Sequence, residues 1–260
     1  MKPILARETL IYSIARLLEG VRHVAVGASS PIPAAGAMLR RALNDGDGGE
    51  AVKISILGSV EHNFFTNGSA ELFDCAGQGR IDAFFLGGGQ IDGTGNINLV
   101  GVGDYPNGTV RWPGSFGSAY LYFVVPRIIL FREEHSVRVL VNKVDFISAA
   151  GVSERNIHRT GGPYALLTGK GLFHFDKERE NFRLTSLHTG HELAEVVEAT
   201  GFDFDYSLEP ERTPDPDTSI LQLLRGRVLD ELSETYPEFA AEMRHEIEKV
   251  SFGTEETQGN

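Results

Sequence analysis

Two hydrophobic periods alternate along the first third of the chain. Apolar residues between positions 10 and 18 recur at helical spacing, and Gly20 follows as a stop signal. A second helical stretch covers residues 33–43. Short apolar runs, typical of buried strands, occupy residues 23–26, 52–57 and 81–86. Strands that alternate with helices in this way predict an α/β fold with an open, largely parallel sheet flanked by helices.

The pattern changes beyond residue 150. Short strands are expected around a turn at Lys170, followed by a short helix and the proline-rich connector LEPERTPDPDTS. An amphipathic helical tail follows over residues 220–250, with a break near Pro237. We therefore expect one domain over residues 1–210 and a helical C-terminal extension over residues 211–260.

Composition narrows the range of partners. The formal net charge of -12 argues against nucleic acid, because phosphate binding needs a basic surface. The most lipid-like run, residues 120–131, is too short to cross a bilayer, so no membrane partner is expected. The single cysteine, Cys75, forms no internal disulfide, and Lys2, Arg7 and Glu8 interrupt any apolar leader. These features favour a cytoplasmic protein.

Three predicted strands are each followed by a glycine: Gly27, Gly58 and Gly87. In open parallel sheets, ligands bind at the edge where the strands end. Gly87 opens the stretch GGGQIDGTGNIN, which lacks the dinucleotide-binding frame and is not followed by a helical pattern. Its turn dipeptides, Asp92-Gly93 and Gly95-Asn96, predict a β-hairpin.

A ligand loop is the alternative interpretation of this stretch. The backbone of Gly88 and Gly89 is unobstructed, and the side-chain amides of Gln90, Asn96 and Asn98 offer hydrogen-bond donors. Such donors suit the carbonyl or carboxylate oxygens of a substrate. Composition alone favours the hairpin over the ligand loop.

A second glycine-serine loop, WPGSFGSAY, precedes an apolar segment. Ser115 or Ser118 would cap a helix that begins there. Alternatively, backbone N–H groups around Gly114 and Gly117 would stabilise a developing negative oxygen. Neither glycine-rich loop contains the G-x-S-x-G nucleophile elbow, which argues against a serine hydrolase.

Two further segments contain side chains of the kinds that bind metals or act as nucleophiles. His188 and His191 would need a third ligand to hold a metal, so surface or capping roles are expected and no metal site is predicted. Glu61 lies just past the strand that ends at Leu57. It is either a solvated loop residue, which generic odds favour, or a carboxylate nucleophile.

Several motifs together resemble the beta-type subunit of class I CoA-transferases, notably glutaconate CoA-transferase. They are, in order, FFLGGGQIDGTGNINLVGVGDY, RWPGSFGS, NKVDFISAAG, GPYALLTGKGLFHFD, LTSLHTG and EATGFDFD, and the similarity covers residues 7–205. The resemblance implies a NagB/RpiA-like open α/β fold and an alpha-type partner subunit in a heterodimer or heterotetramer. It also implies an acyl-CoA thioester as substrate and no permanently bound cofactor.

The family's reaction implies roles for individual residues. A glutamate of the beta-type subunit attacks the thioester, and water has to be excluded so that the adduct is not hydrolysed. Gly117 falls where the family has its backbone oxyanion donor, and Phe116 beside it replaces a small residue. The residues expected to bind the substrate are Gly88, Gly89, Gln90, Asn96, Gly114 and Ser115.

The family's glutamate does not align directly with a glutamate here. An ungapped match places Gly58 at that position, and Glu61 lies three residues later, where a reshaped turn would bring it into use. With Glu61 as nucleophile the chain is a CoA-transferase subunit. Without it, the chain resembles the glutamate-lacking beta-type subunit of the steroid ring-cleaving hydrolase, whose alpha-type partner carries the catalytic carboxylate. A non-enzymatic binding subunit on the same fold is a third hypothesis.

Overall fold

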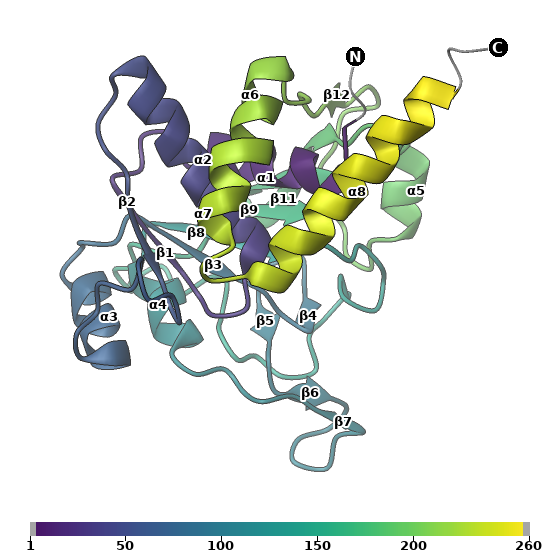
Figure 1. The fold of residues 1–260 in the computed structure, drawn as a ribbon. Helices are drawn as coiled ribbons and strands as arrows, with labels where there is room; N and C mark the ends of the chain where they lie inside the picture. The colour runs from purple at the N-terminus through teal and green to yellow at the C-terminus, as the bar shows by residue number, and fades with distance from the viewer. Residues whose placement is uncertain (1–3, 257–260) are drawn as a thin grey trace. The chain divides into compact units, whose positions relative to one another are not determined.

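The computed structural model describes residues 4–256 of the chain (Figure 1). They form two compact units, one that combines residues up to Phe64 with those from Pro214 onward, and one that covers residues 65–213. The first unit contains α1 (Ala6–Leu17), β1 (His23–Val26), α2 (Pro31–Asp47), β2 (Lys53–Ile56), α6 (Thr218–Leu223), a π-helical turn (Leu224–Val228), α7 (Leu229–Leu232) and α8 (Pro237–Glu256). The second contains α3 (Gly68–Gly77), β3 (Ala83–Leu86), β4 (Gln90–Ile91), β5 (Ile97–Asn98), β6 (Gly101–Val102), β7 (Val110–Arg111), α4 (Ser118–Val124), β8 (Arg127–Arg132), β9 (Pro163–Thr168), β10 (Gly171–Asp176), β11 (Asn181–Leu187), α5 (Leu193–Glu198) and β12 (Glu211–Arg212).

The apolar face predicted for the first helix is buried in the first unit. Ile11 and Ile14 are 0% exposed and lie where α1 packs against α2. A β-carbon at Gly36 of α2 would lie only 2.3 Å from Cγ2 of Ile14, so this glycine permits the close approach of the two helices. Pro31 opens α2, and Gly48 ends it with a left-handed φ of 67°.

Strands β1 and β2 are parallel neighbours and end together. Val26 is paired with Ile56, and the N–H of Leu57 donates to the carbonyl of Val26 at 3.0 Å. Gly27 follows β1 directly and Gly58 lies two residues past Ile56, so both glycines lie past the C-terminal ends of their strands, as the sequence predicts. The edge at which such folds bind ligands is therefore glycine-rich in this unit.

The C-terminal helices belong to the same unit as the first two strands. The π-helical turn and α7 contact α2, and they bury Leu224, Val228, Leu229 and Leu232 completely. The predicted break near Pro237 is confirmed, because α7 ends at Leu232 and α8 begins at Pro237. Within residues 4–256, none of the helices combines the length and hydrophobicity that crossing a bilayer requires.

The second unit is built on strands in the order β12-β11-β10-β9-β8-β3. Strands β3, β8 and β9 are parallel, β9, β10 and β11 form an antiparallel meander, and β12 is parallel to β11. The predicted α/β fold with a largely parallel sheet is thus confirmed. The sequence missed β12, a two-residue strand inside the proline-rich connector, because two residues carry no detectable period.

Two short hairpins leave this sheet. The hairpin predicted for GGGQIDGTGNIN is confirmed: β4 and β5 pair antiparallel, with Gln90 opposite Asn98. Strands β6 and β7 form a second ribbon that projects away from the sheet (Figure 1). The predicted serine cap of α4 is wrong, because the N-cap residue is Gly117 and no side chain caps the helix.

Candidate functional site

The turn after β2 provides an open backbone position. Gly58 has a φ of 92°, a left-handed conformation that favours glycine, and a β-carbon there would meet no atom within 4 Å. Gly58 and Ser29 line a cavity of ≈ 560 Å³, whose other wall includes Tyr236 and Phe239 of the C-terminal segment. The position at which the resemblance places a glutamate therefore faces free space and carries no functional group.

Glu61 lies in the same turn and is exposed. It is not among the residues that line this cavity. The turn is compact, since the N–H of Ser59 donates to the carbonyl of Ile56 at 3.2 Å and the N–H of Ile56 donates to the carbonyl of His62 at 2.9 Å. The carboxylate of Glu61 is thus accessible to solvent, which is compatible with both roles that the sequence leaves open.

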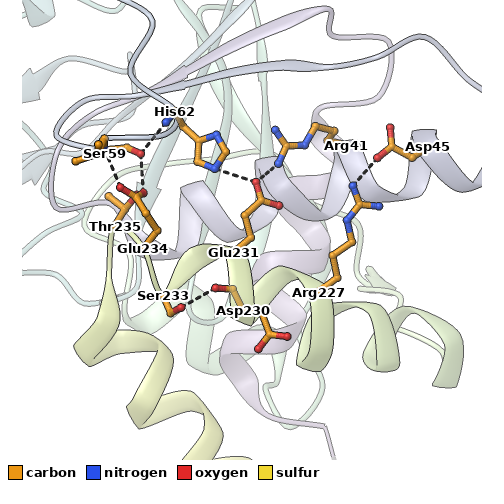
Figure 2. A network of polar contacts seen from close by, with 11 residues as sticks. Arg41, Asp45, Ser59, His62, Arg227, Asp230, Glu231, Ser233, Glu234 and Thr235 are labelled. Carbon is orange, nitrogen blue, oxygen red and sulfur yellow. Dashed lines mark hydrogen bonds and ion pairs between the residues drawn. The ribbon is translucent and has the colours of Figure 1, made fainter.

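A carboxylate from the C-terminal segment holds this turn (Figure 2). Glu234 accepts hydrogen bonds from Oγ of Ser59 at 2.7 Å, from the N–H of Val60 at 2.8 Å and from the N–H of Glu61. The hydroxyl of Thr235 donates to it as well. Burial raises the pKa of Glu234, but these hydrogen bonds outweigh burial and bring the pKa down from 4.5 to about 2. Glu234 is therefore ionised at any working pH.

A second glutamate holds the other end of the turn. Glu231 of α7 lies 2.9 Å from Nε2 of His62 and forms an ion pair with Arg41 of α2 (Figure 2). The N–H of His62 in turn donates to Oγ of Ser59 at 2.9 Å. Sequence reasoning missed both glutamates, because no local motif links residues 231–235 to a turn near residue 60.

The glycine triplet after β3 is packed within the second unit. A β-carbon at Gly88 would lie 2.5 Å from the carbonyl oxygen of Gln90, and one at Gly89 would lie 2.1 Å from Cη2 of Trp112. The indole ring of Trp112 therefore lies directly on the backbone of Gly89, and the N–H of Gly89 donates to the carbonyl of Asn98 at 2.9 Å. The expectation of an unobstructed backbone is wrong for Gly89. The contact of Trp112 with Gly89 joins the two glycine-rich loops that the sequence singled out.

The amide side chains of the hairpin bind other parts of the chain. Gln90 is 6% exposed; its Nε2 donates to Asp145 at 3.0 Å, and its Oε1 accepts from Nδ2 of Asn98 at 2.7 Å. Nδ2 of Asn96 donates to Oδ2 of Asp92 at 3.0 Å. These groups stabilise the hairpin, and a substrate-binding role for Gln90 and Asn96 stays a prediction.

The loop before α4 places a backbone donor beside an aromatic ring. A β-carbon at Gly117 would lie 2.1 Å from Cζ of Phe73, and in residues 4–256 no hydrogen bond uses the N–H of Gly117. Phe116 is 74% exposed with a φ of 46°, and its ring lies 5.4 Å from that of Phe73. The side-chain oxygen of Ser118 is buried and has no hydrogen-bond partner in the described part of the chain. The N–H of Gly117 is thus not engaged within residues 4–256, whereas burial keeps the Ser118 oxygen from solvent.

The two other predicted residues of this loop lie close by in sequence. Gly114 is exposed with a φ of 114°, which favours glycine, and Ser115 is half-buried. The carbonyl of Ser115 accepts the N–H of Ser118 at 2.9 Å. The backbone of Ser115 thus stabilises the start of α4, while a substrate-binding role for its side chain stays a prediction.

The histidine pair contributes no metal site. His188 is buried, with Nδ1 2.9 Å from the hydroxyl of Thr213 and Nε2 2.9 Å from the carbonyl of Thr168, so the predicted surface or capping role is wrong for it. His191 lies 3.2 Å from Glu195. Among the described residues, no group of three or more histidine, cysteine or acidic side chains has the arrangement of a metal site.

Comparison with known proteins identifies the family. The family model described as Coenzyme A transferase matches residues 8–199, about three quarters of the chain. The chain belongs to this family. Membership confirms the resemblance that the ordered motifs indicate, and it leaves Glu231 and Glu234 outside the matched region.

Two relatives are each the B-subunit of a CoA-transferase. The chain is 29% identical to the B-subunit of 3-oxoadipate CoA-transferase of Pseudomonas knackmussii over 220 residues, which are 82% of this chain and 80% of the relative. It is 31% identical to the B-subunit of glutaconate CoA-transferase of Acidaminococcus fermentans over 151 residues, 55% of this chain and 56% of the relative. The similarity thus lies with the beta-type subunit, as the sequence predicts.

Solved structures with similar coordinates share the fold. The decarboxylase AibA/AibB matches with a TM-score of 0.72 at 25% identity, over 88% of this chain and 99% of that chain. Glutaconate CoA-transferase from A. fermentans matches with a TM-score of 0.74 at 21% identity, over 86% and 95% of the two chains. The predicted CoA-transferase-like α/β fold is confirmed.

Proposed function

We propose that this chain is the beta-type subunit of a heteromeric CoA-transferase that moves CoA between an acyl-CoA thioester and a carboxylic acid. The match of residues 8–199 to the Coenzyme A transferase family carries this proposal, and the two B-subunit relatives support it. An alpha-type subunit is the partner, in a heterodimer or heterotetramer. The CoA thioester is a substrate, no cofactor is bound permanently, and the enzyme works in the cytoplasm.

The proposed nucleophile is the carboxylate of Glu61. It attacks the thioester carbonyl, the CoA thiolate leaves, and an acyl–glutamyl anhydride forms. The thiolate then attacks the glutamyl carbonyl, which releases the first carboxylic acid as its anion and leaves a glutamyl–CoA thioester. A second carboxylate takes the CoA by the reverse steps. The exposure of Glu61 and its place just after β2 support this role.

The N–H of Gly117 is the proposed donor to the oxyanion that forms in each addition step. Its lack of a hydrogen-bond partner within residues 4–256 supports this role, since a donor used inside the protein would not be available. The proposed substrate-binding residues are those predicted from the sequence: Gly88, Gly89, Gln90, Asn96, Gly114 and Ser115.

Gly58 favours a second candidate function. Its left-handed φ and the free space around it show a position at the end of β2 that is built for glycine and open to the cavity. In this alternative the alpha-type partner supplies the catalytic carboxylate. The complex then hydrolyses a CoA thioester, or cleaves a C–C bond to open a ring in its acyl group, without an acceptor acid. A solved structure at 25% identity is named a decarboxylase, so loss of CO₂ belongs to the same acceptor-free class.

Acceptor dependence separates the two functions. The complex with the alpha-type subunit is incubated with acyl-CoA thioesters, with and without a panel of carboxylic acids. Exchange of CoA only in the presence of an acid supports the transferase. Free CoA, a ring-opened product or CO₂ without any acid supports the second candidate.

Borohydride trapping tests Glu61 directly. The complex is mixed with acyl-CoA and reduced, and the modified peptide is located by mass spectrometry. We expect reduction at Glu61 in the wild type, none in Glu61→Ala, and normal trapping in Glu50→Ala, which removes another exposed glutamate before β2. A reducible thioester that persists in Glu61→Ala shows that Glu61 is not the nucleophile.

A further inference from the structure

The carboxylate of Glu234 binds three consecutive residues of the turn that follows β2. It accepts the hydroxyl of Ser59 at 2.7 Å, the N–H of Val60 at 2.8 Å and the N–H of Glu61. Two of these donors are backbone groups, so the contact fixes the path of the main chain and not only one side chain. The turn belongs to neither a helix nor a strand, so regular secondary structure does not satisfy these N–H groups.

Glu234 is poorly suited to be a nucleophile itself. With Thr235 included, four donors occupy its two oxygens, which between them offer about four lone-pair directions. It is also absent from the residues that line the cavity beside Gly58. A carboxylate so fully engaged stabilises structure, whereas a nucleophile needs a free lone pair aimed at its substrate.

The same segment reaches the end of β1 as well. The hydroxyl of Tyr236 accepts the N–H of Ser30 at 3.3 Å and donates to the carbonyl of Gly27 at 3.4 Å. Figure 2 shows the contacts of Glu231 to His62 and of Glu234 to Ser59. With the hydrogen bonds of Tyr236, residues 231–236 therefore bind the segments that follow both strands. Tyr236 also lines the cavity that contains Gly58.

We propose that Glu234 is a positioning residue, which holds residues 58–61 in the one conformation that the reaction requires. The proposal rests on the proposed function, because that function places either the reacting glutamate or the open glycine position in this turn. The C-terminal segment thus takes part in the reaction from outside the region that defines the family. Glu234 acts through the backbone of Val60 and Glu61 and touches no substrate.

The test uses the complete complex with the alpha-type subunit. Glu234→Gln keeps the size of the side chain but puts an N–H₂ group where an oxygen faced a backbone donor. Glu234→Asp keeps the charge and shortens the reach. Glu248→Gln is the matched control, because it removes the same charge from an exposed position on α8. Hydrogen exchange of the peptide that covers residues 57–64 is measured beside kcat and KM for the acyl-CoA.

We expect Glu234→Gln to speed exchange in the turn by about tenfold or more, since the local structure opens more often. Its kcat is expected to fall roughly 10- to 100-fold with KM for acyl-CoA within about twofold, because misplacement of the reacting groups affects the chemical step. Glu234→Asp should recover part of kcat, and Glu248→Gln should change neither quantity. A loss of fold would instead move kcat, KM and exchange throughout the chain.

Two results overturn the proposal: exchange in the turn that is unchanged in Glu234→Gln, or faster exchange with kcat within about twofold of the wild type. If Glu234→Gln does not assemble, Ser59→Ala, which removes one of the donors, replaces it with the same criteria. Failure of the proposed function has a different signature, because it shows already in the wild-type complex as a lack of activity on every CoA thioester. That result removes the catalytic role of Glu234 as well.

Discussion

The guanidinium group of Arg225 donates two hydrogen bonds to the carboxylate of Glu8, from Nε to Oε1 at 2.7 Å and from Nη2 to Oε2 at 2.8 Å. The Glu8 side chain is fully buried, and it also accepts the N–H of Leu5 at 2.9 Å, at the start of α1. Arg225 lies in the π-helical turn. This pair therefore joins the N-terminal helix to the C-terminal segment within the first unit.

Removal of one partner of this pair should destabilise the protein strongly. We expect Arg225→Met to lower the free energy of unfolding by about 3–5 kcal/mol, because it leaves the Glu8 carboxylate buried without its counter-charge. Combining it with Glu8→Gln should recover part of the loss. Urea unfolding measures both. The control is Arg244→Met, which breaks an exposed ion pair with Asp230 and should lower the free energy of unfolding by less than about 1 kcal/mol. Equal losses in Arg225→Met and Arg244→Met would contradict the prediction.

Gly36 should not tolerate a methyl group. Its β-carbon would lie 2.3 Å from Cγ2 of Ile14 and 3.1 Å from the carbonyl oxygen of Ile11, so Gly36→Ala forces α1 and α2 apart. We expect a loss of about 1–3 kcal/mol in the free energy of unfolding. Gly46→Ala on the same helix meets no atom within 4 Å and should gain up to about 1 kcal/mol from helix propensity. A gain in both variants would show that the helices are not this close.

Gly89→Ala should displace the indole ring of Trp112. The added carbon would lie 2.1–2.4 Å from three ring atoms. Trp112 is the single tryptophan of the chain, so the tryptophan emission of this chain reports the surroundings of this one ring. We expect a red shift of the emission and, with the alpha-type partner present, lower activity. Gly27→Ala, whose nearest neighbour would be 3.9 Å away, should leave the emission unchanged; an unshifted spectrum in Gly89→Ala would rule out the stacking.

His135 should make the protein less stable in acid. Burial, with the nearby charge of Lys170 as a smaller cause, lowers the pKa of His135 from 6.5 to about 4. Both ring nitrogens lie within hydrogen-bond distance of threonine hydroxyls, 2.8 Å for Thr168 and 2.9 Å for Thr200. Because the unfolded chain binds the proton more tightly, stability is complete above pH 6.5 and falls as the pH drops toward 4.

The measurement for His135 is the difference between two pH profiles of urea unfolding. From pH 7 to pH 4 the wild type should lose up to about 3 kcal/mol more than His135→Gln, because glutamine has no titratable group at position 135. His245→Gln, an exposed histidine of α8, serves as the control and should follow the wild type. Parallel profiles for the wild type and His135→Gln would show that His135 does not couple folding to pH.

The sequence predicted those helices, strands and turns whose signals lie within a short stretch of the chain. The apolar residues between positions 10 and 18 gave α1 because helical period and burial coincide there, and β1 was predicted with its bounds unchanged. Asp92 explains why the hairpin was recognisable: its carboxylate accepts the N–H groups of Thr94 and Asn96 at 3.2 and 3.0 Å inside the five residues that separate β4 from β5.

The features that the sequence did not predict depend on residues that come into contact only in the folded chain. Ser59 and Glu234 are 175 positions apart, so no window of sequence contains both halves of their contact. Gly117 replaced the expected serine cap of α4 because the ring of Phe73, from a different helix, occupies the space that a side chain would need. The ordered motifs identified the family but cover none of the segment that carries Glu234.

The first unit is assembled from two segments, one up to Phe64 and one from Pro214 onward, that flank the second unit in the sequence. During synthesis, residues up to Phe64 leave the ribosome about 150 residues before Pro214. Strands β1 and β2 are therefore made well before the C-terminal helices of the same unit, whereas residues 65–213 are made as one continuous stretch. Loss of the segment from Pro214 onward would remove the helices of the first unit that contact α2, while the contacts within residues 65–213 do not involve that segment. The conformation of the β2 turn thus depends on Glu234, which is synthesised 175 residues after Ser59.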